Sequence, residues 1–188
     1  MIYPIVAYGT PVLKKQAAII DRDNPDILDI IKNMFDTMYN AHGVGLAAPQ
    51  IGLSLRLFII DASPFDDEDP SLKGVKKVFI NAQIIEEEGK EWKFNEGCLS
   101  IPTIREDIER KPTIRMKYQD ENFVEHEETY SGILARVIQH EYDHIEGVLF
   151  TDRLSQLRRA ILKSKLQDIS KGKVQVDYRM KFPMLKRN

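Results

Sequence analysis

The sequence is poor in cysteine and has no long apolar run. Cys98 is the single cysteine among 188 residues, which excludes an intrachain disulfide and is consistent with a reducing compartment. No apolar stretch approaches the roughly 18 residues that a membrane-spanning helix needs. The N-terminal residues lack the basic region and apolar stretch of a secretory signal, and they lack the Arg-rich character of a transit peptide. We therefore expect a cytoplasmic protein that does not contact a membrane.

The composition is typical of a globular protein. Hydrophobic residues make up 43% of the chain and charged residues 30%. A chain of 188 residues can bury one sizeable core, and no internal repeat, low-complexity tract or linker divides it. We expect a single domain over residues 1–188.

Charge is distributed unevenly, although the net charge is only −2. From Arg153 to the end of the sequence there are 11 Lys and Arg residues and 2 acidic residues, so the preceding part is acidic. A basic C-terminal helix and tail of this kind can touch nucleic acid or another acidic surface. A solvated helix face explains the same charges more simply.

Apolar spacing and the residues that start and stop helices predict three helices. They run from Pro25 to a stop at Gly43, over residues 132–146, and over residues 155–169. Asn24 and Ser131 are the expected N-caps of the first two, and Gly147 is the expected end of the second.

Short apolar or alternating segments predict the strands. These are residues 55–60, 78–85, 104–109, 113–118 and 123–130. The last two form a hairpin, residues 61–75 form a loop, and residues 174–180 are either a final strand or a trailing segment. Together the elements predict an α+β fold, a single domain with antiparallel strands around a central metal-binding helix.

The central helix contains the run His140-Glu141-Tyr142-Asp143-His144. Two histidines four residues apart project from one helix face, so both imidazoles can reach one metal ion. The Glu141 carboxylate lies at a neighbouring angle, where it can exchange protons with water activated by the ion. Two core histidines without a metal would show the same spacing and remain the alternative.

Apolar residues share the face that bears the histidines. Ile133 and Val137 lie seven and three positions before His140, on the same stripe of the helix. Apolar side chains would therefore flank the ion, which suits an apolar substrate group beside the reacting bond.

A helical His-Glu-x-x-His run first suggests a zinc peptidase, but the usual third ligand is missing. Such enzymes take that ligand downstream, and Phe150 occupies the position where a third histidine would stand. The acidic residues further downstream match no such motif. The third ligand should therefore lie upstream, where Cys98 is the outstanding candidate.

Three motifs in fixed order make the chain resemble the peptide deformylase family. They are Gly43-Val-Gly-Leu-Ala-Ala-Pro-Gln50, Glu96-Gly-Cys-Leu-Ser100 and Gln139-His-Glu-Tyr-Asp-His144. The resemblance extends from about Gly9 to Leu154. It implies a single catalytic domain, in a cytoplasm of bacterial type, that removes the N-terminal formyl group from formyl-methionyl nascent peptides and releases formate.

The resemblance also implies how the reaction centre is built. Cys98, His140 and His144 would hold one divalent ion per chain, with water at the fourth position. Glu141 would act as general base and then as the acid for the leaving amine. Cysteine and histidine suit Zn²⁺, Fe²⁺, Ni²⁺ or Co²⁺, and the resemblance favours Fe²⁺ for activity.

Further residues are assigned through the same resemblance. The side-chain amide of Gln50 and the backbone N–H of Leu99 would stabilise the oxyanion, and Gly45 would hydrogen-bond the substrate backbone. We expect Ile133 and Val137, from the apolar stripe of the helix, and Val44 and Phe94, which lie close to the matched motifs, to form the walls of the methionine pocket. Arg105, seven residues after Cys98, is expected to meet the peptide backbone beyond the methionine. An exposed structural role explains Arg105 equally well.

The first motif also fits a loose dinucleotide-binding pattern, which we reject. A helix precedes Gly43 where that pattern needs a strand, and Pro49 disrupts the helix that should follow. Glycines there are better explained by close approach of a substrate to the backbone.

Two other functions remain to be weighed. A metallopeptidase of the His-Glu-x-x-His type is the main alternative, and a non-catalytic metal-binding module is the second. Glu141 argues against the module, because a purely structural site has no need of an acid–base group. We also expect a monomer whose basic C-terminal region helps it to approach ribosomes.

Overall fold

The computed structural model describes residues 1–184, so residues 185–188 of the predicted basic tail lie outside it. Within that part of the chain the α-helices are α1 (Ile27–Asn40), α2 (Gly132–Ile145) and α3 (Gln156–Ser170). The strands are β1 (Ile5–Val6), β2 (Gly45–Ala47), β3 (Leu57–Asp61), β4 (Lys76–Glu88), β5 (Trp92–Cys98), β6 (Ile101–Arg110), β7 (Thr113–Gln119), β8 (Glu125–Ser131) and β9 (Met180–Lys181).

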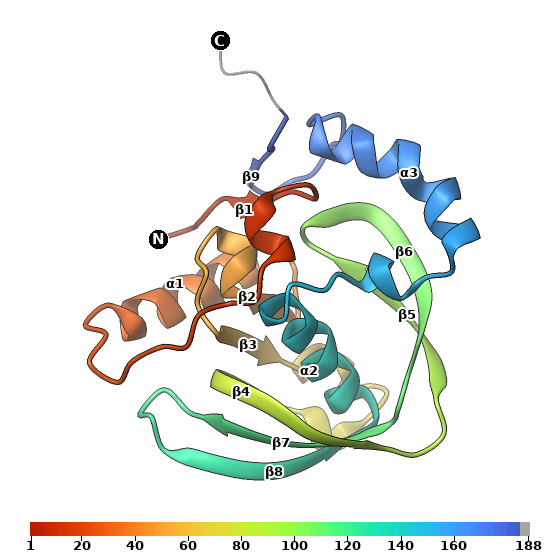
Figure 1. Cartoon of the computed structure of the whole chain (residues 1–188). Coiled ribbons are helices and arrows are strands. Elements are labelled where there is room, and N and C mark those ends of the chain that lie inside the picture. Colours follow the sequence, from red (N-terminus) through yellow and green to blue (C-terminus); the bar gives the residue numbers. More distant parts are fainter. Residues whose placement is uncertain (185–188) are drawn as a thin grey trace.

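The strands form one large sheet and two small ones. The large sheet is antiparallel throughout, with the order β2-β3-β4-β7-β8. Strands β5 and β6 form a separate antiparallel hairpin, and β1 pairs in parallel with β9. The large sheet passes beneath α2, the β5–β6 hairpin curves past its other side, and α3 lies at the edge of the molecule (Figure 1). The predicted α+β domain around a central helix is confirmed.

Helix α2 is buried on several faces, and this positions its functional side chains. Ala135 and Ile138 join an apolar cluster with Phe58 and Phe79 of the large sheet. On the side of the hairpin, Arg136 donates to the carbonyl of Ile108 at 2.9 Å. The helix is therefore clamped between the sheet and the hairpin, with little freedom to rotate.

The first helix begins later than predicted. Helix α1 starts at Ile27, so Pro25 is not its first residue. The Asn24 side chain accepts a hydrogen bond from the N–H of Asp26 at 3.1 Å, which is an Asx turn before the helix and not an N-cap. The predicted stop before Gly43 is confirmed: the helix ends at Asn40, and the N–H of Gly43 donates to the carbonyl of Met38 in the last turn.

The second helix matches its prediction more closely. Ser131 occupies the N-cap position, but its side chain makes no capping hydrogen bond. Its hydroxyl lies 3.1 Å from that of Thr113 on the neighbouring strand. Gly147 follows the helix with a φ of 74°, the left-handed conformation expected of a terminating glycine.

The β5–β6 hairpin departs most from the prediction, which missed β5 and shortened β6 to residues 104–109. Alternate residues of β6 are buried, but Glu106 and Arg110 occupy two of the buried positions. Glu96 is buried in the same way on β5. Charged residues on the inner face interrupt the apolar alternation from which strands are predicted.

The predicted β7–β8 hairpin is confirmed, but its turn is longer. The Asp120 carboxylate accepts backbone hydrogen bonds from Asn122 at 2.9 Å and Val124 at 3.0 Å. Phe123 has a φ of 57° inside this turn, so the second strand begins at Glu125.

The segment after α3 is mostly a trailing segment, with a short strand at its end. Of its residues up to 184, only Met180–Lys181 pairs with another strand. Among the residues that the structure describes, no helix is long and apolar enough to cross a membrane.

Candidate metal centre and substrate cavity

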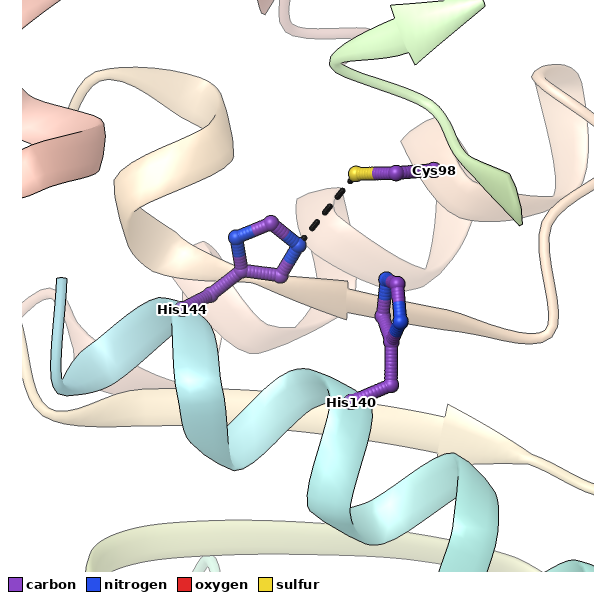
Figure 2. Close-up of side chains that lie close together, drawn as sticks. All are labelled: Cys98, His140 and His144. Atoms are coloured by element: carbon purple, nitrogen blue, oxygen red, sulfur yellow. Dashed lines mark hydrogen bonds between the residues drawn. The ribbon is translucent and has the colours of Figure 1, made fainter. Parts of the chain in front are cut away.

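Three potential metal ligands converge from two elements. Cys98 ends β5, and His140 and His144 lie one turn apart on α2. The ligand atoms of the three residues all lie within 4.8 Å of one another. The Sγ of Cys98 is 3.3 Å from Nε2 of His144, and both imidazoles face the thiol (Figure 2). The structure thus brings the three predicted ligands together.

This donor set fits a divalent ion of the zinc or ferrous type. A thiolate and two imidazoles are ligands that such ions prefer, and tetrahedral coordination places sulfur and nitrogen about 3.5 Å apart. The Cys98–His144 distance of 3.3 Å is close to that value. Burial and the charge of His140 lower the pKa of His144 well below its usual range, which keeps it in the neutral form that binds metals.

Glu96 orients the first histidine. Its Oε2 lies 2.9 Å from Nδ1 of His140, which leaves Nε2 to face Cys98. Burial lowers the pKa of His140, but hydrogen bonds with Cys98 and Glu96 outweigh burial and raise the pKa well above the usual range. A metal ion bound between these groups would displace that proton.

Arg110 holds the carboxylates that stand behind the ligands. Its Nε and Nη2 donate to the two oxygens of Glu96 at 2.8 and 2.9 Å, and its Nη1 donates to Asp143 at 2.8 Å. Its side chain is only 1% exposed. Burial raises the pKa of Glu96, but hydrogen bonds from Arg110 and His140 outweigh burial and hold the pKa well below its usual range. Arg153 adds two hydrogen bonds of 2.6 Å to Asp143.

Glu141 is a buried carboxylate next to the first histidine. It is 4% exposed, and its Oε2 has no hydrogen-bond partner among the described residues. Burial raises the pKa of Glu141 to about 7. A carboxylate with such a pKa can both take up and release a proton near neutral pH.

Gly45 makes room for this carboxylate. A Cβ added to Gly45 would lie 2.7 Å from Cγ and Cδ of Glu141, closer than real side chains approach. The first motif therefore needs a glycine here for Glu141, in addition to any contact with a substrate.

The Gln50 amide is aimed at the ligands. Its Oε1 accepts a hydrogen bond from the N–H of Ala47 at 2.8 Å, which fixes the amide plane. Its Nε2 then lies 3.5 Å from Sγ of Cys98 and 3.4 Å from Oγ of Ser100. Leu99, between those two residues, lines the same cavity.

A cavity of about 580 Å³ opens beside the ligands. Of the residues predicted to meet the substrate, Val44, Phe94, Arg105 and Val137 line it. Ile133 does not, and packs instead against the apolar cluster between α2 and the large sheet. Ile133 was predicted to reach the substrate because it shares a helix face with His140. Seven residues span about 10 Å of helix, however, so the Ile133 side chain lies past the cavity.

Two groups of residues around this site were not predicted from the sequence. One is the set of charged side chains around Arg110, although Glu96 and Asp143 both stand inside the quoted motifs. The other is residues 175–178, which line the cavity from the C-terminal side. The alternation of apolar and polar residues from 174 to 182 was the available signal for that segment.

Comparisons with known proteins all match peptide deformylases. The family model described as polypeptide deformylase matches residues 2–160. A peptide deformylase of Christiangramia forsetii is 61% identical over all of this chain and 99% of its own length, and one of Flavobacterium johnsoniae is 56% identical over the same shares. A crystal structure of a peptide deformylase from Legionella pneumophila superposes with a TM-score of 0.79 at 38% identity, covering 92% of this chain and 98% of that one.

Replacing Arg110 with Met should lower the free energy of unfolding by about 3 kcal/mol. The buried carboxylates of Glu96 and Asp143 would lose the cation that they share and would keep one arginine each, Arg136 for Glu96 and Arg153 for Asp143. Urea denaturation measures the loss. Arg115→Met is the matched control, since Arg115 pairs with Glu86 and Glu127 on the surface, where such pairs contribute little. If both variants lost stability equally, Arg110 would not have the role that its burial suggests.

Proposed function

Because this chain belongs to the polypeptide deformylase family, we propose that the cavity beside Cys98, His140 and His144 is its reaction site. The chain is a metal-dependent hydrolase that removes the N-terminal formyl group from formyl-methionyl peptides, giving formate and a free amine. The observation that supports this location is the convergence of three ligand atoms and a buried carboxylate beside one cavity.

We assign Cys98, His140 and His144 as the ligands of one divalent ion. When bound, the ion supplies Lewis acidity that activates water and polarises the formyl carbonyl. Fe²⁺ is our proposal for the native ion, with Zn²⁺, Ni²⁺ and Co²⁺ as alternatives, because affinity alone does not choose among these metals. Glu96 keeps the ring of His140 in the orientation that the site needs.

Glu141 is the residue that we assign to proton transfer. It takes a proton from the attacking water and returns it to the leaving nitrogen. Its burial, its oxygen without a partner and the space left by Gly45 all support this role. Exposed carboxylates elsewhere on the chain lack these features.

Two donors are assigned to the developing oxyanion. They are the Gln50 side-chain amide and the backbone N–H of Leu99, which flank Cys98 from two directions. The hydrogen bond from Ala47 preorganises Gln50 before substrate arrives. Fixed donors of this kind stabilise the transition state more than the ground state.

The substrate would lie along the cavity with its formyl group at the ligands. The methionine side chain would contact Val44, Phe94 and Val137, and the peptide backbone would run past Gly45. Arg105, whose guanidinium is held by Asn95 at 2.7 and 2.8 Å, would meet the peptide beyond the methionine.

We propose that residues 1–188 act as one catalytic domain, as a monomer in the cytoplasm, where nascent peptides emerge. Basic side chains of α3 would contact the ribosome, since phosphate-rich RNA attracts clustered Lys and Arg. Charge reversal at Arg159 and Lys163 should weaken co-sedimentation with ribosomes, and unchanged co-sedimentation would dismiss the contact.

Glu141→Gln should lower kcat by about 10³-fold, because the variant keeps the shape of the side chain but cannot carry the proton. The assay is formate release from formyl-Met-Ala-Ser, with metal content measured in the same sample. Glu125→Gln, an exposed carboxylate on β8, is the control and should behave as the parent.

In the same assay the parent should leave acetyl-Met-Ala-Ser and unmodified Met-Ala-Ser intact. Cleavage of an internal bond would favour the peptidase alternative. Full turnover by Glu141→Gln would remove that residue from the mechanism.

Val44→Asp should raise KM for formyl-Met-Ala-Ser and lower kcat/KM by about 10-fold or more, since a carboxylate would face the apolar methionine. Ile133→Asp is the paired control, because Ile133 lies outside the cavity lining. Steady-state kinetics on both variants tests the pocket. Equal losses in the two variants would contradict the proposed walls.

A further inference from the structure

The segment after α3 runs along one side of the cavity. We call residues 174–182 the C-terminal strap; they lie beyond residues 2–160, the part that matches the family model. Along it half-buried residues alternate with exposed ones, and the half-buried ones are Val174, Val176, Tyr178, Met180 and Phe182. Backbone hydrogen bonds from Ile5 to Arg179 and from Ala7 to Lys181, both 2.9 Å, fix its far end.

The strap forms one wall of the substrate cavity through residues 175–178. Asp177 lies 3.5 Å from Nε2 of His42, which precedes the first motif. Both side chains are exposed, so this pair contributes little energy. It nevertheless shows that the strap reaches the loop that carries the first motif.

Tyr178 connects the strap to the site by a hydrogen bond. Its hydroxyl donates a hydrogen bond of 2.9 Å to the carbonyl oxygen of Leu99, 79 positions away in the sequence. Burial raises the pKa of Tyr178, as do the charges of Cys98 and Asp177, so the hydroxyl stays protonated and remains a donor at neutral pH.

The backbone at Leu99 is held from outside its own hairpin. It lies in the tight turn between β5 and β6, directly after the ligand Cys98. The next carbonyl, that of Ser100, accepts a hydrogen bond from the N–H of Tyr8 at 2.8 Å. Two consecutive carbonyls are therefore held by groups from outside the hairpin, and Tyr178 supplies one of them.

We propose that Tyr178 is a positioning residue for deformylation: its hydroxyl holds the carbonyl of the Leu99–Ser100 peptide unit, and this restricts the φ and ψ angles of Leu99 and so limits the movement of the Leu99 N–H in the preceding unit. An oxyanion donor is effective when its direction is fixed before the reaction. Without the hydroxyl the backbone at Leu99 gains freedom, and the donor is aimed less accurately in the transition state. Loss of the hydroxyl leaves the apolar side chains that we expect to bind the methionine unchanged.

This inference rests on the proposed function, and its signature is a separation of kcat from KM. Tyr178→Phe removes one oxygen and should lower kcat by about 10-fold, while KM for formyl-Met-Ala-Ser changes less than about 2-fold. The rate is expressed per metal-bound chain, so a change in metal occupancy cannot imitate the effect. Thermal unfolding of each variant shows whether the fold is intact.

Tyr39→Phe is the matched control. Its hydroxyl also makes a short hydrogen bond, 2.6 Å to Asp61, but it lies away from the cavity. This control should keep the kcat of the parent. A Tyr178→Phe variant with kcat within about 2-fold of the parent would overturn the inference and leave the proposed function standing. A change in KM alone would also overturn it, whereas a parent without formate release would reject both.

Discussion

The buried guanidinium of Arg110 is the interaction on which the site depends. It joins Glu96 on β5 to Asp143 on α2, and these two elements carry the three proposed metal ligands. Glu96 in turn orients His140. Burying such charges is costly, and their attraction recovers that cost only with good geometry, so the cluster contributes more to a defined arrangement than to net stability. Arg110 thus links the strand that carries the thiol to the helix that carries the imidazoles, beside the apolar packing and the Arg136 contacts that hold the helix in place.

Close packing around the three ligand residues also fixes the other groups that line the cavity. The absence of a side chain at Gly45 leaves space for Glu141, whose burial raises its pKa to about 7. Gln50 is fixed by a backbone N–H and so presents its amide to Cys98. The backbone at Leu99 is fixed from the other side by Tyr178, a residue outside the matched family region. The residues that we assign to proton transfer, oxyanion stabilisation and substrate contact therefore all line one cavity.

The sequence predicted the helices and the ligands better than the hairpin and the cavity. Because His140 and His144 are four residues apart, helix geometry alone places them on one face, and the apolar residues around them predict a buried helix. The lack of a suitable downstream residue made Cys98 a candidate ligand, and its motif then assigned it, since nothing local says that a strand end meets a helix. Strand β5 was missed because the inner face of its hairpin carries Glu96, Glu106 and Arg110, which are neutralised by partners distant in sequence. The contribution of the strap depends on where the chain returns after α3, and that is a property of the tertiary fold.

The central claim is that one metal ion at Cys98, His140 and His144 supports hydrolysis of the formyl amide. The most direct measurement is formate release from formyl-Met-Ala-Ser by protein purified without oxygen, with the metal identified and counted in the same sample. The account predicts about one ion per chain, predominantly iron, and turnover that is lost when a chelator removes the ion and restored when Fe²⁺ is added. A fully metallated protein that releases no formate would contradict it.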